Sequence, residues 1–206
     1  MTINGSGIYD AKNFDATGAT VQFTGSEGTL KLGGATVSSL GNTFTAGTGT
    51  VEYDYEGNQN VKSRTYYNLE IDGSGSKSTQ GDITINNNLT ISAATFDIGT
   101  GDDNLNIGGN FTNTGTFSSS GEVITFDGTS SQTIPSIIDA DATIYINGKV
   151  AMSQELGDDR YFEHNLDKGR NIIPIIPAKT GVGDISFKLS ITELLTLNTK
   201  KTRQPI

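Results

Sequence analysis

The stretch GDITINNNLTISAATFDIG (residues 81–99) aligns with DNLNIGGNFTNTGTFSSSG (residues 103–121) without gaps, and we call this pair the short-offset repeat. In each copy, apolar residues alternate with Thr, Asn or Asp, as in residues 83–85, and this period of two is typical of β-strands with one buried face. Asn and Gly interrupt the alternation so soon that each strand is too short to bury its apolar face alone. We therefore expect the copies to stack, with about three short strands per coil, as in a parallel β-helix.

The alignment also predicts which side chains are neighbours. Ile83 should lie over Leu105 in the next coil, about 4.8 Å away. Within the second copy, the alternation predicts that Ile107 faces the core and that Asn106 faces outward.

The composition favours an all-β protein with a thin, regular core. Only 33% of the 206 residues are hydrophobic, glycine occurs 26 times and tryptophan is absent. Low apolar content can accompany disorder, but here the apolar residues are regularly spaced and mostly β-branched. Apolar residues at the helical spacing of 3.6 are not found before the last thirty or so residues.

Charge divides the chain into two parts. Residues 1–134 contain 14 acidic and 5 basic residues, whereas residues 135–206 contain nine of each. The acidic body argues against nucleic acids and anionic membranes as partners. The sequence has no apolar stretch long enough to span a membrane, and it has no cysteine for a disulfide or a thiolate metal site.

The first residues, MTINGSGIYD (residues 1–10), have neither the basic nor the apolar region of a secretory signal peptide. Two interpretations are open. Either the protein stays inside the producing cell until assembly or lysis, or the chain is a piece of a longer protein.

A second repeat joins parts of the chain that lie farther apart, and we call it the long-offset repeat. FTAGTGTVEYDYEGNQNV (residues 44–61) aligns with FSSSGEVITFDGTSSQTI (residues 117–134) without gaps, which pairs Gln59 with Gln132. We interpret this longer offset as a unit of about three coils. Residues 1–43, which precede both repeats, are predicted to be an atypical coil that caps one end of the β-helix.

These repeats, together with the intervening TYYNLEIDGSG (residues 65–75), resemble the repeats of large adhesin-like surface proteins of Bacteroidetes-type bacteria. Those repeats are similar to the right-handed parallel β-helix of autotransporter passengers. The resemblance covers residues 44–134 and implies a right-handed parallel β-helix with an extracellular role. Similar β-helices occur in bacteriophage fibres and spikes, which act at the same cell surface and need no signal peptide.

The sequence changes character at Pro135, and we predict a domain boundary at residues 135–140. All four prolines lie from here onward, and the spacing of the short-offset repeat is lost. ATIYINGKVAM (residues 142–152) contains the Asn-Gly dipeptide of a β-hairpin. The following residues faintly resemble galactose-binding-like β-sandwich modules. We predict that residues 135–206 form a β-rich capping or docking module that holds homo-oligomers together or binds other assembly proteins.

No group of residues has the spacing of a catalytic site. The single histidine, His164, is not accompanied by a nucleophile motif, and we interpret it as a structural or solvated residue. Lyases and hydrolases need clustered acids together with a base, but residues 1–134 contain no histidine and only scattered basic residues. The acids Glu52, Asp54 and Glu56 alternate with tyrosines, so they are predicted to form the outward face of one strand. We expect no enzymatic activity.

One stretch suggests a calcium site. IGTGDDNLN (residues 98–106) matches a calcium-binding nonapeptide repeat except at its first glycine. Asp102, Asp103 and Asn104 offer the oxygen ligands that calcium prefers. We nevertheless favour a Gly/Asp corner between coils, because such calcium sites normally need consecutive copies, and a calcium site is the alternative. No other cofactor is predicted.

Two further features concern the surface. Asn88 and Asn110 each begin a glycosylation sequon, but because they lie one coil apart we predict an asparagine ladder, with each side-chain amide bonding to the next coil. The largest aromatic group in the body consists of Tyr53, Tyr55, Tyr66 and Tyr67. We favour core packing for these rings, and a platform on which a glycan stacks is the alternative.

Three functional hypotheses follow. The first is a non-enzymatic structural or adhesive component of a bacteriophage virion surface, such as a fibre, spike or capsid decoration, with host surface glycans as candidate ligands. The second is a fragment of a secreted bacterial adhesin at the cell surface. The third is a glycan-cleaving β-helix enzyme.

Overall fold

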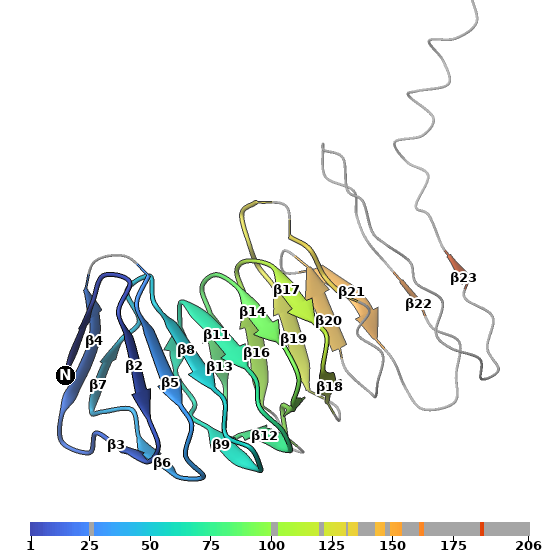
Figure 1. Cartoon of the computed structure of the whole chain (residues 1–206). Coiled ribbons are helices and arrows are strands. Elements are labelled where there is room, and N and C mark those ends of the chain that lie inside the picture. Colours follow the sequence, from blue (N-terminus) through green and yellow to red (C-terminus); the bar gives the residue numbers. More distant parts are fainter. Residues whose placement is uncertain are drawn as a thin grey trace, which may run out of the picture.

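The structure is a computed structural model that describes residues 1–24, 27–99, 103–119, 122–130 and 132–135, together with four short strands farther along the chain. In these parts of the chain there are strands and turns but no helix. The first 19 strands pass in one repeating order through three faces, and strands of successive coils pair in parallel (Figure 1). The prediction of an all-β, parallel β-helical fold is confirmed.

The three faces are visited in turn by every coil. Face I is a single six-stranded sheet with the stacking order β2 (Ile8–Ala11), β5 (Thr29–Leu32), β8 (Thr50–Tyr53), β11 (Asn68–Ile71), β14 (Leu89–Ile91) and β17 (Phe111–Asn113). Face II comprises β3 (Phe14–Asp15), β6 (Val37–Ser39), β9 (Gln59–Val61), β12 (Ser76–Thr79), β15 (Thr95–Asp97) and β18 (Thr116–Ser118). Face III comprises β1 (Thr2–Asn4), β4 (Thr20–Thr24), β7 (Thr43–Thr45), β10 (Thr65–Tyr66), β13 (Ile83–Ile85), β16 (Asn104–Ile107) and β19 (Val123–Phe126).

The register agrees with the short-offset repeat. Ile83 lies opposite Leu105 in face III, and Leu89 lies opposite Phe111 in face I, both in parallel pairs. Along face I as a whole, the distance in sequence between partners varies from coil to coil, because the corners between the faces differ in length. The predicted neighbours are therefore confirmed, whereas the period is constant only locally.

The interior is filled by columns of apolar side chains, one above another. In face I the column consists of Leu30, Val51, Leu69, Leu89 and Phe111, none more than 2% exposed. In face III, Ile107 is buried and Asn106 is only half-buried, so the predicted alternation is confirmed. Burying one large apolar side chain contributes roughly 1.5–3 kcal/mol, so a coil of short strands gains its stability from the coils on either side.

Residues 1–43, predicted to be an atypical coil, form β1 to β6 and reach the start of β7, in the same order of faces as the rest. Their strands pair in register with the following coils, as Tyr9 does with Leu30. The first coil differs in its exposure: Ile8 is 70% and Tyr9 48% exposed. Tyr9 continues the inward column of face I but has no described coil on its other side.

The long-offset repeat does not correspond to a whole number of coils. Val51 lies in β8 of face I, whereas its counterpart in the alignment, Ile124, lies in β19 of face III. The prediction of a three-coil unit is therefore wrong. Similar residues occupy different faces because all three faces use the same alternation of short strands.

What recurs in the long-offset repeat is a local motif of strand, corner and glutamine. Gln59 is buried, and its Nε2 donates to the carbonyl oxygens of Leu32 and Gly34 at 2.6 and 2.8 Å. Gln132 Nε2 makes the same pair of hydrogen bonds to carbonyl oxygens of an earlier coil, at 2.9 and 2.5 Å. Each amide therefore joins its own coil to the corner of the preceding one.

Lys77 occupies the equivalent position one coil beyond Gln59, and it is fully buried. Its Nζ donates to the carbonyl oxygens of Tyr55, Gly57 and Ser74 at 2.6, 2.7 and 2.6 Å. Burial lowers the pKa of this ammonium group, and acidic side chains around the same corner oppose the effect. All three ammonium protons have acceptors, so the charge is accommodated inside the coil.

Beyond Pro135 the structure describes four strands. β20 (Thr143–Ile146) pairs in parallel with β19 and extends face III, and β21 (Lys149–Ser153) pairs with β20 in antiparallel orientation, as the predicted hairpin requires. β22 (Tyr161–Phe162) and β23 (Ser186–Phe187) follow in the same sheet. The rest of the predicted C-terminal module, with His164, lies outside the described residues.

Candidate functional site

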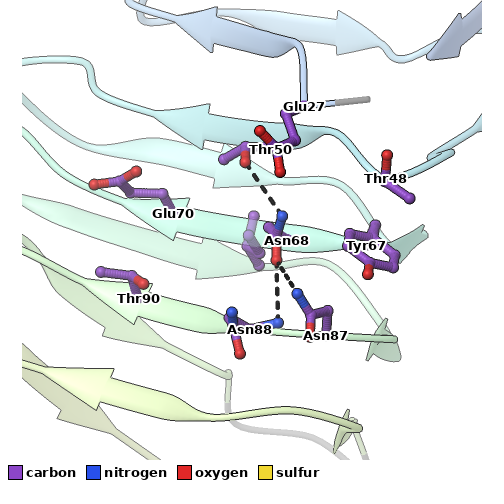
Figure 2. Close-up of a pocket in the computed structure, with 10 residues that line it drawn as sticks. Glu27, Thr48, Thr50, Tyr67, Asn68, Glu70, Asn87, Asn88 and Thr90 are labelled. Atoms are coloured by element: carbon purple, nitrogen blue, oxygen red, sulfur yellow. Dashed lines mark hydrogen bonds between the residues drawn. The ribbon is translucent and has the colours of Figure 1, made fainter. Parts of the chain in front are cut away.

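The outward side of face I has a depression of about 580 Å³ near the start of its strands. It is lined by Glu27, Thr48, Thr50, Tyr67, Asn68, Leu69, Glu70, Asn87, Asn88 and Thr90. These residues come from β8, β11 and β14 and from the segments that precede strands of this face. In Figure 2, Asn68 lies at the centre of the depression, with Tyr67 on one side and Glu70 on the other.

Asn68 is held in place by the neighbouring coils. Its Nδ2 donates to Thr50 Oγ1 at 3.4 Å, and its Oδ1 accepts from Asn87 Nδ2 at 2.9 Å and from the backbone N–H of Asn88 at 3.2 Å. These contacts fix the floor of the depression before any ligand binds.

The predicted asparagine ladder starts at Asn68. Asn88 Oδ1 accepts from the backbone N–H of Asn110 at 2.9 Å, and Asn110 Oδ1 accepts from that of Thr133 at 2.8 Å. The ladder is thus confirmed, but its bonds between coils join side-chain carbonyls to backbone amides. Such bonds stabilise the corner because they satisfy backbone donors outside the strand ladders.

A charged group lies beside the depression on the same face. Lys31 Nζ is 2.8 Å from Glu52 Oε1 and 3.5 Å from Asp54 Oδ2. Burial raises the pKa of Glu52, which the hydrogen bond from Lys31 opposes, and that same hydrogen bond raises the pKa of Lys31. Glu70 in the next coil accepts a hydrogen bond from Ser92 at 3.1 Å. These side chains hold adjacent coils together. Glu52 lies on β8 and faces outward as predicted, but β8 ends at Tyr53, so the prediction that Asp54 and Glu56 belong to the same strand is wrong.

Only part of the predicted tyrosine platform lies at the surface. Tyr53 and Tyr66 are fully buried, so they cannot stack on a glycan, and core packing is the correct interpretation for them. Tyr67 lies at the corner between β10, which ends at Tyr66, and β11, and it is only half-buried. Tyr67 lines the depression, whereas Tyr55, also partly exposed, lies at a corner outside it.

The two buried tyrosines form a hydrogen-bonded pair. Their hydroxyl oxygens are 3.1 Å apart, Tyr66 donates to the carbonyl oxygen of Lys62 at 2.5 Å, and the backbone N–H of Lys62 donates to Tyr53 at 3.1 Å. Because Tyr66 gives its proton to the carbonyl, Tyr53 is the donor between them. Burial raises the pKa of Tyr53 to about 12, and it raises the pKa of Tyr66 as well.

These tyrosines should make the protein sensitive to alkali. Above about pH 10 the unfolded chain releases tyrosine protons that the folded chain retains, so stability is complete below that pH and falls as the pH rises toward 12. For Tyr53 the loss is about 3 kcal/mol. Denaturant titrations at about pH 9 and pH 11.5 should show the fall, and tyrosinate absorbance should show a late-titrating class. A single tyrosine class near pH 10 in the folded protein would contradict this expectation.

At the predicted calcium site, Asp102 lies outside the described residues. Asp103 Oδ2 accepts hydrogen bonds from Thr79 Oγ1 and from the backbone N–H of Gly81, both at 3.1 Å. The backbone N–H and side-chain amide of Asn104 donate to Asp82 Oδ1 at 2.8 and 3.1 Å. Within the described residues no three acidic or histidine side chains are grouped to hold a metal. The geometry fits a Gly/Asp corner, and we derive no function from calcium.

Sequence patterns missed several residues of the depression. Glu27, Asn68 and Asn87 belong to different coils and meet only because successive coils stack. The signal that identifies Asn68 is its alignment with Asn88 in the next coil, where the residues that follow them are paired. No corresponding signal marks Glu27, whose position depends on the corner before β5.

Comparison of the chain with protein-family models, curated proteins and solved structures finds no match. The resemblance of residues 44–134 to adhesin-like repeats therefore remains a prediction, and the fold rests on the strand pairing alone. Among the described residues, no helix has the length and apolar character needed to cross a membrane.

Proposed function

We propose that the protein is a non-enzymatic structural and adhesive component of a surface assembly. The observation that carries this proposal is how the outward polar side chains of face I are used. The asparagine ladder, the Lys31–Glu52 ion pair and the Ser92–Glu70 hydrogen bond all join one coil to the next. A surface that stiffens the stack suits a protein that carries load or displays contacts at a distance.

The carboxylates also argue for a non-enzymatic role. Glycosidases use a carboxylic acid with a raised pKa beside a second carboxylate. Here burial raises the pKa of Glu52, but its carboxylate is bound by Lys31 and does not line the depression. Glu27 and Glu70 do line it, and they serve there as hydrogen-bond acceptors in our proposal.

A cleavage assay tests the non-enzymatic proposal. The purified full chain, incubated with polysaccharides from the surface of candidate host bacteria, should release no new reducing ends or unsaturated products over the buffer control. Measurable turnover would refute the proposal. If the turnover were lost on Glu27→Gln or Glu70→Gln, the glycan-cleaving alternative would take its place.

Among surface assemblies, a bacteriophage virion is our first proposal and a secreted bacterial adhesin our second. Immunogold electron microscopy of a source culture separates the two. Label on free particles would support a fibre, spike or capsid decoration. Label confined to the cell envelope would support the adhesin.

The proposed homo-oligomer is tested separately, by light scattering of the purified chain.

A further inference from the structure

We propose that the depression around Tyr67 binds an uncharged oligosaccharide and that its acidic lining discriminates against acidic glycans. This inference rests on the adhesive part of the proposed function, to which it adds a site and a class of ligand.

The Tyr67 ring supplies the apolar contact. Tyr67 is half-buried beside the fully buried Tyr66, and its carbonyl oxygen accepts a hydrogen bond from the backbone N–H of Asn87 at 2.9 Å. The backbone N–H of the next residue, Asn68, donates to the carbonyl oxygen of Gly49 at 3.1 Å, so the backbone that presents the ring is bonded to the coil on either side. An aromatic ring presented in this way offers a flat, largely apolar surface to the C–H face of a sugar at little entropic cost.

Polar groups around the ring match sugar hydroxyls. Asn68 is already oriented by Thr50 and Asn88, so its amide does not have to be ordered when a ligand binds. Glu70 accepts one hydrogen bond from Ser92, and a carboxylate has further lone pairs for hydroxyl donors. Hydrogen bonds from sugar hydroxyls to such a carboxylate are charge-assisted and stronger than neutral ones.

The charges of the lining give the selectivity. Glu27 and Glu70 are both acidic, and none of the residues that line the depression is basic. The nearby Lys31 is engaged by Glu52 and Asp54. A uronic acid or a sulfated sugar would bring its anion close to these carboxylates without a compensating cation, which costs affinity.

The extent of the depression favours a chain of sugars over a single one. Its lining reaches from Glu27, just before β5, to Asn88 and Thr90 at β14, and so crosses three strand spacings. At about 4.8 Å per spacing this is roughly 14 Å.

Glu27 also has a φ of 66°, the one positive value for a non-glycine residue among the described residues. Strained backbone of this kind is concentrated at functional sites.

The test uses the purified full chain and defined probes. Chitohexaose, cellohexaose and mannohexaose are the uncharged ligands and hexagalacturonate is the acidic one, measured by saturation-transfer NMR and calorimetric titration. We expect at least one uncharged hexasaccharide to bind more tightly than hexagalacturonate. Tyr67→Ala should weaken that binding about tenfold, whereas Tyr67→Phe, which keeps the ring, should retain it.

Tyr55→Ala is the matched control, because Tyr55 is a partly exposed tyrosine outside the depression. It should leave binding unchanged. The double variant Glu27→Gln with Glu70→Gln keeps the shape of the lining. It should reduce the difference in affinity between the uncharged hexasaccharides and hexagalacturonate. This comparison does not depend on the folding of Tyr67→Ala.

Several results would overturn the inference: no binding of any uncharged hexasaccharide, equal losses for Tyr67→Ala and Tyr55→Ala, or tighter binding of hexagalacturonate. A negative result here leaves the non-enzymatic proposal intact, since that proposal fails only on turnover. Turnover together with intact binding would refute the non-enzymatic role but would still support the proposed oligosaccharide-binding site around Tyr67.

Discussion

Replacing Lys77 with methionine is expected to lower the free energy of unfolding by about 3–5 kcal/mol. Methionine keeps the unbranched apolar stem of the side chain but removes the ammonium group, which donates to three backbone carbonyl oxygens. Removing the buried charge relieves a desolvation cost, which in some proteins makes such a change neutral. Here the acceptors are backbone carbonyls that no substitution removes, so the loss of their donors should dominate.

Urea titration of the full chain measures the effect, and Lys62→Met is the matched control. Lys62 Nζ bonds to Gln80 at an exposed site, so its replacement should change the stability by no more than about 0.5 kcal/mol. Lys77→Gln should recover part of the loss, because Gln59 joins carbonyls at the equivalent corner one coil earlier. If Lys77→Met were as mild as Lys62→Met, the three hydrogen bonds would contribute little to stability.

Much of the fold was predictable because residues that are neighbours in adjacent coils of a β-helix occur at similar positions of a sequence repeat. The short-offset repeat placed Ile83 over Leu105, and the alternation placed Ile107 inward. Most stacked positions in the interior bury apolar residues, so a repeat of apolar residues indicates both the register of the strands and the side that faces the core. The long-offset repeat misled for the same reason. A strand, a corner and a glutamine look alike on any face, and similarity alone does not say which face holds them.

The site was less predictable because it is assembled across coils. The pair Tyr66-Tyr67 shows the limit. Tyr66 is the last residue of β10 and lies in the core, whereas Tyr67 lies at the corner before β11, and the sequence does not mark where the strand ends. Tyr53 lies at the end of β8, after which the alternation no longer applies, so the position of Tyr55 depends on the corner. Lys77 was not recognised as a core residue, because lysine is rarely buried and two of its three carbonyl acceptors lie in a corner of the preceding coil.

Replacing Ile107 with aspartate is expected to have an even larger effect and to unfold the stack around β16. Ile107 is fully buried, and its partners in the adjacent coils are Ile85 and Phe126. The substitution places a carboxylate in an apolar column, where no side chain of opposite charge is paired with it. The cost of several kcal/mol is comparable to the whole stability of a typical domain.

The neighbouring position provides the control, because Asn106 belongs to the same strand and the same coil. Asn106 lies between Thr84 and Thr125 on the outward side, so Asn106→Asp should change the stability by less than about 1 kcal/mol. Circular dichroism and amide hydrogen exchange should show lost β-structure for Ile107→Asp and a native profile for Asn106→Asp. Because coils contact only their neighbours, exchange should rise first in β13, β16 and β19 and last in β2 and β5. Equal effects of the two substitutions would mean that the inward and outward columns of face III are misassigned.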